Sequence, residues 1–197
     1  MNKEEFQHGY DIESYVSNLR NYRSLVKKLM ETAQVKAEHI SALRDAAGGY
    51  VQPVRATMMT EDWCGDSACN LPLLAPLFEG AGIEFRVFRG SEKEDLKAMY
   101  ENDGDDHIPV VSLWDGEGKE LGRWIEAPQA IQEHKETWKA AHPNFERLYL
   151  QQKEGDKQAA KEFGTLYRQF LEEMSAWYQE GLWDETAREI VQLPGSR

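Results

Sequence analysis

Apolar residues near the start of the chain recur at the spacing of a helix. The stripe consists of Tyr15, Leu19, Tyr22, Val26 and Leu29. Its steps of four, three, four and three residues match a 3.6-residue period. The pattern predicts helix over residues 12–47, with Asp11 as the N-terminal cap and a second helical segment from about Ala37 that ends at Gly48-Gly49.

Short β-rich segments alternate with helical ones through the middle of the chain. Strands are predicted over residues 54–60, 83–89, 109–114 and 119–125, and helices over residues 65–78, 91–100 and 128–141. Ser91 and Glu94 have the spacing of a capping box, and residues 115–118 predict the turn of a hairpin. This order predicts one parallel strand pair and one antiparallel hairpin in a mixed four-stranded sheet flanked by helices.

The remainder of the chain, from about residue 144, is predicted to be helical. Its apolar stripe consists of Phe163, Leu166, Tyr167, Phe170, Leu171, Met174, Trp177 and Tyr178. Such a stripe is typical of a core or of the face of a homodimer, and both alternatives stay open. Gly181 is expected to end this helix and Asp184 to cap a last short one. We therefore expect an N-terminal helical extension over residues 1–50, a core over 51–141 and a C-terminal helical extension over 142–197 that packs on the core.

Composition and charge exclude several classes of function. The chain has 197 residues, 41% of them hydrophobic, which is enough for one well-buried core. Its net charge of −12 disfavours nucleic acid and anionic membranes as partners. It has no apolar stretch of membrane-spanning length and no apolar segment near Met1 of the kind found in signal peptides. We expect a cytoplasmic location, where structural disulfides are rare and a pair of cysteines suggests reactivity, a metal or simple burial.

Both cysteines lie in the segment Trp63-Cys64-Gly65-Asp66-Ser67-Ala68-Cys69, between a predicted strand and a predicted helix. The N-terminus of a helix favours a thiolate, and the hydroxyl of Ser67 is placed to donate to the sulfur of Cys64. The charge of Asp66 acts in the opposite direction. Cys64 is therefore expected to be an activated thiol. Cys69 is either a small core residue or an auxiliary, resolving thiol.

The segment from Glu61 to Asp66 resembles the start of the active site of the thioredoxin-like superfamily. Pro72, eight residues beyond Cys64, lies where thioredoxins have a proline in the active-site helix. The Ile108-Pro109 pair opens a predicted strand and resembles the cis-proline of the family. The resemblance covers about 90 residues and implies an α/β thioredoxin-like fold. The extensions lie outside it and are similar to those of some bacterial thioredoxin-family proteins with a Glu-Asp-Trp-Cys-Gly-Asp signature.

The unchanged spacing from Cys64 to Pro72 places Ser67 at the position of the resolving cysteine and makes Cys69 an additional one. On an ideal helix, Cα atoms three positions apart are separated by about 5 Å and those five positions apart by about 8.6 Å. A disulfide needs less than about 7 Å, so a Cys64–Cys69 bond would require the first helical turn to unwind. The resemblance further implies a buried aspartate six residues before the first cysteine, where this chain has Met58.

The resemblance implies a thiol–disulfide oxidoreductase, and its departures indicate a monothiol type that uses Cys64, with Ser67 and Cys69 as further candidate catalytic residues. The expected binding residues are Trp63, Gly65, Asp66, Ile108 and Pro109. Expected partners are protein disulfides or a low-molecular-weight thiol. No cofactor is expected, and no metal either, because the spacing of Cys64, Cys69 and His107 matches no zinc site. The alternative is a protein-binding module that has lost redox activity.

Overall fold

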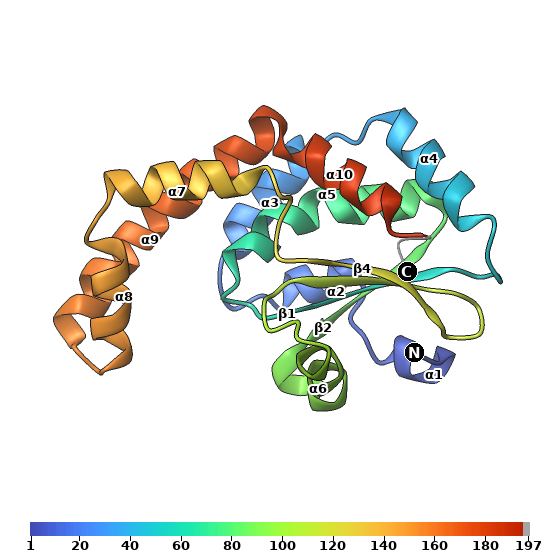
Figure 1. The fold of residues 1–197 in the computed structure, drawn as a ribbon, viewed down its shortest axis with the longest axis horizontal. Coiled ribbons are helices and arrows are strands. Elements are labelled where there is room, and N and C mark those ends of the chain that lie inside the picture. The colour runs from blue at the N-terminus through green and yellow to red at the C-terminus, as the bar shows by residue number, and fades with distance from the viewer. Residues whose placement is uncertain (195–197) are drawn as a thin grey trace. The chain divides into compact units, whose positions relative to one another are not determined.

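A mixed sheet of four strands forms the centre of the fold in the computed structural model, which describes residues 1–194 (Figure 1). The strands are β1 (Arg55–Thr60), β2 (Glu84–Arg89), β3 (Val110–Trp114) and β4 (Glu120–Ile125). Their order is β2-β1-β3-β4; β1 pairs with β2 in parallel and with β3 antiparallel, and β3 pairs antiparallel with β4. The predicted mixed sheet, with its parallel pair and its hairpin, is confirmed.

The helices fall into two compact units of the chain. They are α1 (Lys3–Gln7), α2 (Ile12–Ser17), α3 (Arg23–Thr32), α4 (Ala37–Ala47), α5 (Gly65–Ala81), η1 (Gly90–Glu92), α6 (Glu94–Asn102), α7 (Ile131–Ala141), α8 (Phe145–Lys153), α9 (Lys157–Trp177), η2 (Tyr178–Leu182) and α10 (Trp183–Gln192). The first unit comprises Met1–Pro128 and the chain from Trp183 onward, and the second comprises Gln129–Leu182. The division therefore differs from the boundaries expected at residues 50 and 141, because α1–α4 and α10 belong to the sheet-containing unit.

Helices cover both faces of the sheet in the first unit (Figure 1). On one face, α5 contacts α3, α4 and α10. On the other face, Leu96 and Tyr100 of α6 pack against Met59, Phe88 and Val110 of the strands. Every residue of β1 is buried, as expected for a central strand covered on both sides. The cysteine segment therefore begins directly after a buried, internal strand of the sheet.

The helix predicted from residue 12 is interrupted between α2 and α3. Its backbone leaves the helical conformation after Ser17, and Tyr22 has a left-handed φ of 55°. The carbonyl of Asn18 accepts a hydrogen bond from Arg89 at 3.3 Å, and the N–H of Arg20 donates to Asp62 at 3.2 Å. These partners are more than 40 residues away in sequence. The periodic stripe does not reveal such long-range bonds, and the prediction of a helix that continues past Ser17 was wrong.

Two predicted helix caps also have other roles. Ser91 does not cap α6; its N–H and hydroxyl donate to Glu61 at 2.6 and 3.1 Å, and α6 begins at Glu94. Asp184 lies inside the first turn of α10, where its carboxylate binds Lys36 and His39. In both cases a distant polar partner replaces the local capping bond.

The aromatic stripe of α9 packs within the second unit. Phe170, Met174 and Tyr178 are buried. The ring of Phe170 lies 4.7 Å from that of Trp138 in α7 and 5.8 Å from that of Phe145 in α8. These residues therefore contribute to a core, which is one of the two roles expected for the stripe. A homodimer through the same helix stays a prediction.

Among the helices of residues 1–194, none combines the length and the apolar character needed to cross a membrane.

Candidate active site around Cys64

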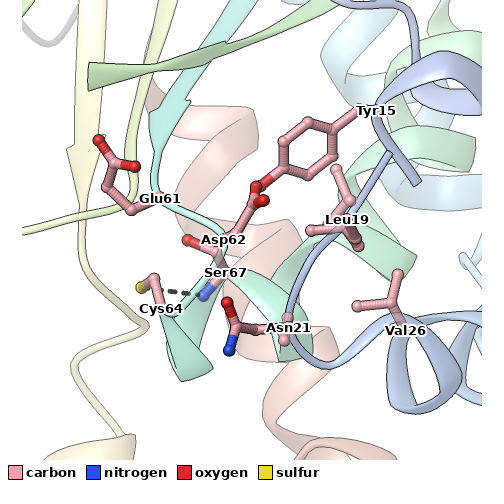
Figure 2. A pocket seen from close by; sticks show the side chains of 10 residues that line it. Tyr15, Leu19, Asn21, Val26, Glu61, Asp62, Cys64 and Ser67 are labelled. Atoms are coloured by element: carbon pink, nitrogen blue, oxygen red, sulfur yellow. Dashed lines mark hydrogen bonds between the residues drawn. The ribbon is translucent and has the colours of Figure 1, made fainter. Parts of the chain in front are cut away.

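Cys64 lies at the N-terminus of α5, immediately after the turn that follows β1. It is the N-cap residue, and its sulfur accepts a hydrogen bond from the backbone N–H of Ser67 at 3.4 Å (Figure 2). The thiol itself donates to the carbonyl oxygen of Ile108 at 3.4 Å. Only 6% of Cys64 is exposed. The sulfur is thus held between the start of a helix and the loop that precedes β3.

Ile108 and Pro109 form the second wall of the site. The peptide bond between them is cis. The carbonyl of Pro109 accepts a hydrogen bond from Glu126 at 2.7 Å, which ties this loop to the end of β4. The structure thus brings together Cys64 and Ile108, two residues that the sequence separates by 44 positions. Trp63, next to Cys64 in the chain, is 60% exposed and is the most exposed large apolar side chain described.

The hydroxyl of Ser67 is buried and bonded to a second hydroxyl. Its partner is Thr60, the last residue of β1, which is fully buried. The Thr60 hydroxyl also donates to the carbonyl of Glu61 at 3.3 Å. Thr60 was not among the predicted site residues, although a polar residue that ends a buried strand just before the cysteine segment is a usable signal. The Ser67 hydroxyl therefore lies between the Cys64 sulfur and the Thr60 hydroxyl.

Burial controls the ionisation of Cys64. Removal of the sulfur from water raises the pKa of Cys64 to about 11, and the negative charge of Asp66 acts in the same direction. Hydrogen bonds from the Ser67 hydroxyl and from the N–H groups of Ser67 and Asp66 lower the pKa of Cys64, but by less. The direction is opposite to that of the activated thiol predicted from sequence, because burial favours the protonated form of Cys64.

Cys69 is buried deeper in α5. Both cysteines are thiols, and Cys69 has no exposed surface. Its backbone carbonyl accepts a hydrogen bond from the indole of Trp183 in α10 at 2.8 Å. The neighbouring Asn70 accepts one from Thr186 of the same helix at 2.9 Å. Cys69 therefore lies in the part of α5 that α10 covers, an environment typical of a core residue.

A buried ion pair lies behind the cysteine. The carboxylate of Asp62 contacts the Arg89 guanidinium at 2.8 Å, and both side chains are less than 10% exposed. The guanidinium also lies over the rings of Tyr10 and Tyr15, at 4.7 and 5.4 Å. Burial and the charge of Asp62 raise the pKa of Tyr15 above its usual range. Asp62 thus has a structural role that the sequence did not predict, and Arg89 was not singled out at all.

A cavity of about 10 Å³ lies beside Asp62 and the start of α5. Its size corresponds to about one water molecule. It is lined by Tyr15, Leu19, Asn21, Val26, Glu61, Asp62, Cys64, Ser67, Ala68 and Leu71. Figure 2 shows Cys64 and Ser67 on one side and the side chains of α2, α3 and the interruption between them on the other. The N-terminal helices are therefore part of the site.

His107 does not add a metal-binding group to the site. Its side chain is 65% exposed and pairs with Asp106 at 2.6 Å. Within residues 1–194, no three or more His, Cys, Asp or Glu side chains are arranged to hold a metal ion.

Comparison with known proteins gives one family and several similar structures. A family model described as thioredoxin matches residues 9–139, which includes α2, α3 and α4 as well as the sheet. No curated protein matches. A crystal structure of a protein of unknown function from Pseudomonas aeruginosa aligns over 98% of this chain and 96% of its own, with 19% identity and a TM-score of 0.60.

A crystal structure of an HIV epitope scaffold aligns over 98% of this chain and 97% of its own, with 18% identity and a TM-score of 0.61. At these identities the two structures bear on the fold alone. A DsbH oxidoreductase aligns over 56% of this chain and 84% of its own, with 16% identity and a TM-score of 0.28, too low to support an argument.

Proposed function

The chain belongs to the thioredoxin family, and from this premise we propose that it performs thiol–disulfide exchange with Cys64 as its only exchanging thiol. One observation carries the proposal: the Cys64 sulfur accepts the Ser67 N–H at the start of α5 while it faces the carbonyl of Ile108. Ser67 occupies the position of the resolving cysteine, and Cys69 is fully buried five residues along the helix. A second protein thiol is therefore not assigned to the reaction.

The exchange needs a thiol from outside the protein. The Cys64 thiolate attacks one sulfur of a disulfide, so that the disulfide breaks, a mixed disulfide forms and the leaving sulfur takes up a proton. A low-molecular-weight thiol, as its thiolate, then attacks the mixed disulfide. This step releases Cys64 as its thiolate. A new disulfide then joins the small thiol to the part of the substrate that had been bound to Cys64. The external thiol supplies the electrons in each cycle.

Two cysteine variants test the single-thiol mechanism. Cys64→Ser is expected to abolish turnover of a mixed disulfide between a peptide and a small thiol, because the remaining thiol, Cys69, is fully buried. Cys69→Ser is expected to retain most of the activity, provided that its thermal midpoint stays close to that of the parent protein. An equal loss in both variants, with both folded, would show that Cys69 resolves the mixed disulfide and would overturn the monothiol mechanism.

The high pKa of Cys64 also supports a second candidate function, a binding module without redox turnover. A thiol with a pKa of about 11 is ionised in only about one molecule in ten thousand at pH 7. Met58, which is fully buried in β1, supplies no base. An exchange assay at pH 9 distinguishes the two functions, since the thiolate fraction there is about a hundredfold larger. Turnover that equals that of Cys64→Ser even at pH 9 would favour the binding module.

A further inference from the structure

The hydroxyls of Thr60 and Ser67 share too few protons to satisfy every acceptor around them at once. Each hydroxyl carries one proton. Thr60 is within bonding distance of the Glu61 carbonyl and of Ser67, and Ser67 is also within reach of the Cys64 sulfur. Because Thr60, Ser67 and Cys64 are buried, their side chains exchange hydrogen bonds mainly with one another and with neighbouring carbonyls. The direction of each bond is therefore set by its neighbour.

The protonated thiol fixes one direction for this chain of bonds. Cys64 uses its proton on the carbonyl of Ile108. Thr60 then donates to the carbonyl of Glu61, and Ser67 donates to Thr60, so that each proton has an acceptor. In this arrangement the Ser67 proton points away from the sulfur.

Ionisation of Cys64 reverses the direction. A buried thiolate is an acceptor only, and the Ser67 hydroxyl is the side-chain donor beside it. When Ser67 turns its proton to the sulfur, Thr60 can turn its own proton to Ser67. The two states thus differ by a concerted rotation of two hydroxyls, and Thr60 is the acceptor that competes with the sulfur for the Ser67 proton.

We propose that Thr60 is a positioning residue that determines whether Ser67 donates its proton to Thr60 or to the Cys64 sulfur. The proposal rests on the proposed function only in taking Cys64 as the reacting thiol. It assigns a role to a side chain that touches neither a substrate nor the sulfur. It also gives Ser67 a role in the first step, the attack by the Cys64 thiolate. A resolving cysteine at this position would act in the second step, the cleavage of the mixed disulfide.

The proposal predicts opposite effects for two substitutions. Ser67→Ala removes the donor to the thiolate, so the pKa of Cys64 rises. Thr60→Val removes the bond between Thr60 and Ser67 from both states, but it removes the bond from Thr60 to the Glu61 carbonyl from the thiol form alone. Ser67 is then left with the sulfur as its acceptor, and the pKa of Cys64 falls. The net value of one such bond corresponds to a change of about 0.5 to 1 in that pKa. A merely structural role for Thr60 does not predict this pair of signs.

The experiment is the pH profile of Cys64 alkylation. The full chain carries Cys69→Ala so that only one thiol reacts, and iodoacetamide incorporation is followed by intact mass between pH 7 and pH 11. Thr57→Val is the matched control: Thr57 is also a buried threonine of β1, but its hydroxyl accepts from Trp114 instead of facing the site. The expected result is a profile moved to lower pH in Thr60→Val, to higher pH in Ser67→Ala and unchanged in Thr57→Val.

A profile in Thr60→Val that is unchanged or moved to higher pH would overturn the proposal. If Thr60→Val does not fold, Thr60→Ala provides the same test, and Thr60→Ser, which keeps the hydroxyl, is expected to retain the parental profile. The alkylation profile needs no disulfide substrate. Failure of the proposed function, as absent turnover, is therefore distinguishable from failure of this inference, as unchanged alkylation profiles.

Discussion

At the scale of single residues, Ser67 is the position that most directly tests the register of the site. We predict that Ser67→Cys forms a disulfide with Cys64 under mild oxidation. The Ser67 N–H already contacts the Cys64 sulfur at 3.4 Å, and Cα atoms three positions apart on a helix lie about 5 Å apart, within disulfide range. Intact mass after oxidation should fall by two hydrogens and recover on reduction.

The control for this experiment is Ser67→Cys combined with Cys64→Ser, in which the disulfide is not expected. Peptide mapping identifies the linked pair in the single variant. A bond that joins Cys64 to Cys69 would contradict the prediction, because it would show that the first turn of α5 unwinds.

The buried thiol of Cys64 also predicts how stability depends on pH. Its pKa is raised from about 9 to about 11 in the folded protein, so the folded state keeps its proton over a range in which the unfolded state has lost it. The free energy of unfolding should therefore fall as the pH rises from about 9 to about 11, by about 2.5 kcal/mol, with no contribution below pH 8.

Urea unfolding of the parent protein and of Cys64→Ser at pH 8 and pH 10.5 isolates this contribution, because the other titrating groups are common to both. Between pH 8 and pH 10.5, the free energy of unfolding of the parent protein should fall relative to that of Cys64→Ser. A constant difference would show that Cys64 does not titrate as a buried thiol.

At the scale of elements, the Asp62–Arg89 pair joins the loop after β1 to the end of β2 and to the interruption between α2 and α3. We predict that Asp62→Asn lowers the free energy of unfolding by about 3 kcal/mol, because it leaves a buried guanidinium without a countercharge. Urea unfolding at pH 7 measures the change. Replacing both partners, as Asp62→Asn with Arg89→Met, should restore part of the loss.

The matched control is the exposed pair of Lys97 and Glu101, which are 3.5 Å apart and about half exposed. Glu101→Gln should change the free energy of unfolding by no more than about 0.5 kcal/mol. Equal losses in Asp62→Asn and Glu101→Gln would contradict the importance of burial.

A second pair of elements, α4 and α10, is joined by Asp184. Hydrogen bonds from Lys36 and His39 lower the pKa of Asp184 to about 2. Because this is below the unfolded value of about 3.9, the stabilisation is complete above pH 4 and is lost as the pH falls towards 2. Because solvent screens the charges of the partly exposed partners, Asp184→Asn should cost only about 1 kcal/mol at pH 6 and progressively less under acid conditions.

Urea unfolding at pH 6 and pH 3 checks this prediction. Glu185→Gln is the control, since Glu185 in the same turn pairs only with Arg188 among the contacts described and is more exposed. A loss in Asp184→Asn that does not shrink towards low pH would contradict the assignment.

The strands were predictable from sequence, whereas the polar contacts across the fold were not. Four alternating segments and the spacing from Cys64 to Pro72 are local patterns, and the structure reproduces the strands within one residue at each end. The interruption after Ser17 depends on Asp62 and Arg89, which no local period contains.

Contacts distant in sequence also explain why the ionisation of Cys64 was not predicted. A helix N-terminus is visible in sequence, and it favours a thiolate. The burial that raises the pKa of Cys64 involves parts of the chain far from it, including residues of α2 and α3, which were predicted to lie outside the core. The sign of the pKa change was therefore not predictable from the cysteine segment alone.

At the scale of the whole molecule, the sheet-containing unit is built from two separate stretches of chain. We predict that a chain ending at residue 141, the boundary suggested by the sequence, does not unfold cooperatively. It lacks α10 and therefore the bonds of Trp183 and Thr186 to α5 and of Glu189 to Trp124. Far-ultraviolet circular dichroism in urea measures cooperativity, with the full chain as control.

Alkylation gives an independent readout for the shortened chain. Cys64 and Cys69 should both react with iodoacetamide at pH 7, whereas Cys69 of the full chain is protected by its burial. A cooperative transition together with a protected Cys69 would show that the sheet and its N-terminal helices need no contribution from α10.

The return of α10 to the first unit has a consequence for synthesis on the ribosome. Domains generally fold as units, the N-terminal one first, as the chain emerges. Here the sheet is translated early, but the helix that covers α5 emerges only after Gln129–Leu182. The helices of Gln129–Leu182 contact near neighbours in sequence. This segment can therefore complete its folding while the sheet-containing unit still lacks α10. A nascent chain stalled before residue 183 would accordingly expose the α5 surface to chaperones, although most of the protein has already been made.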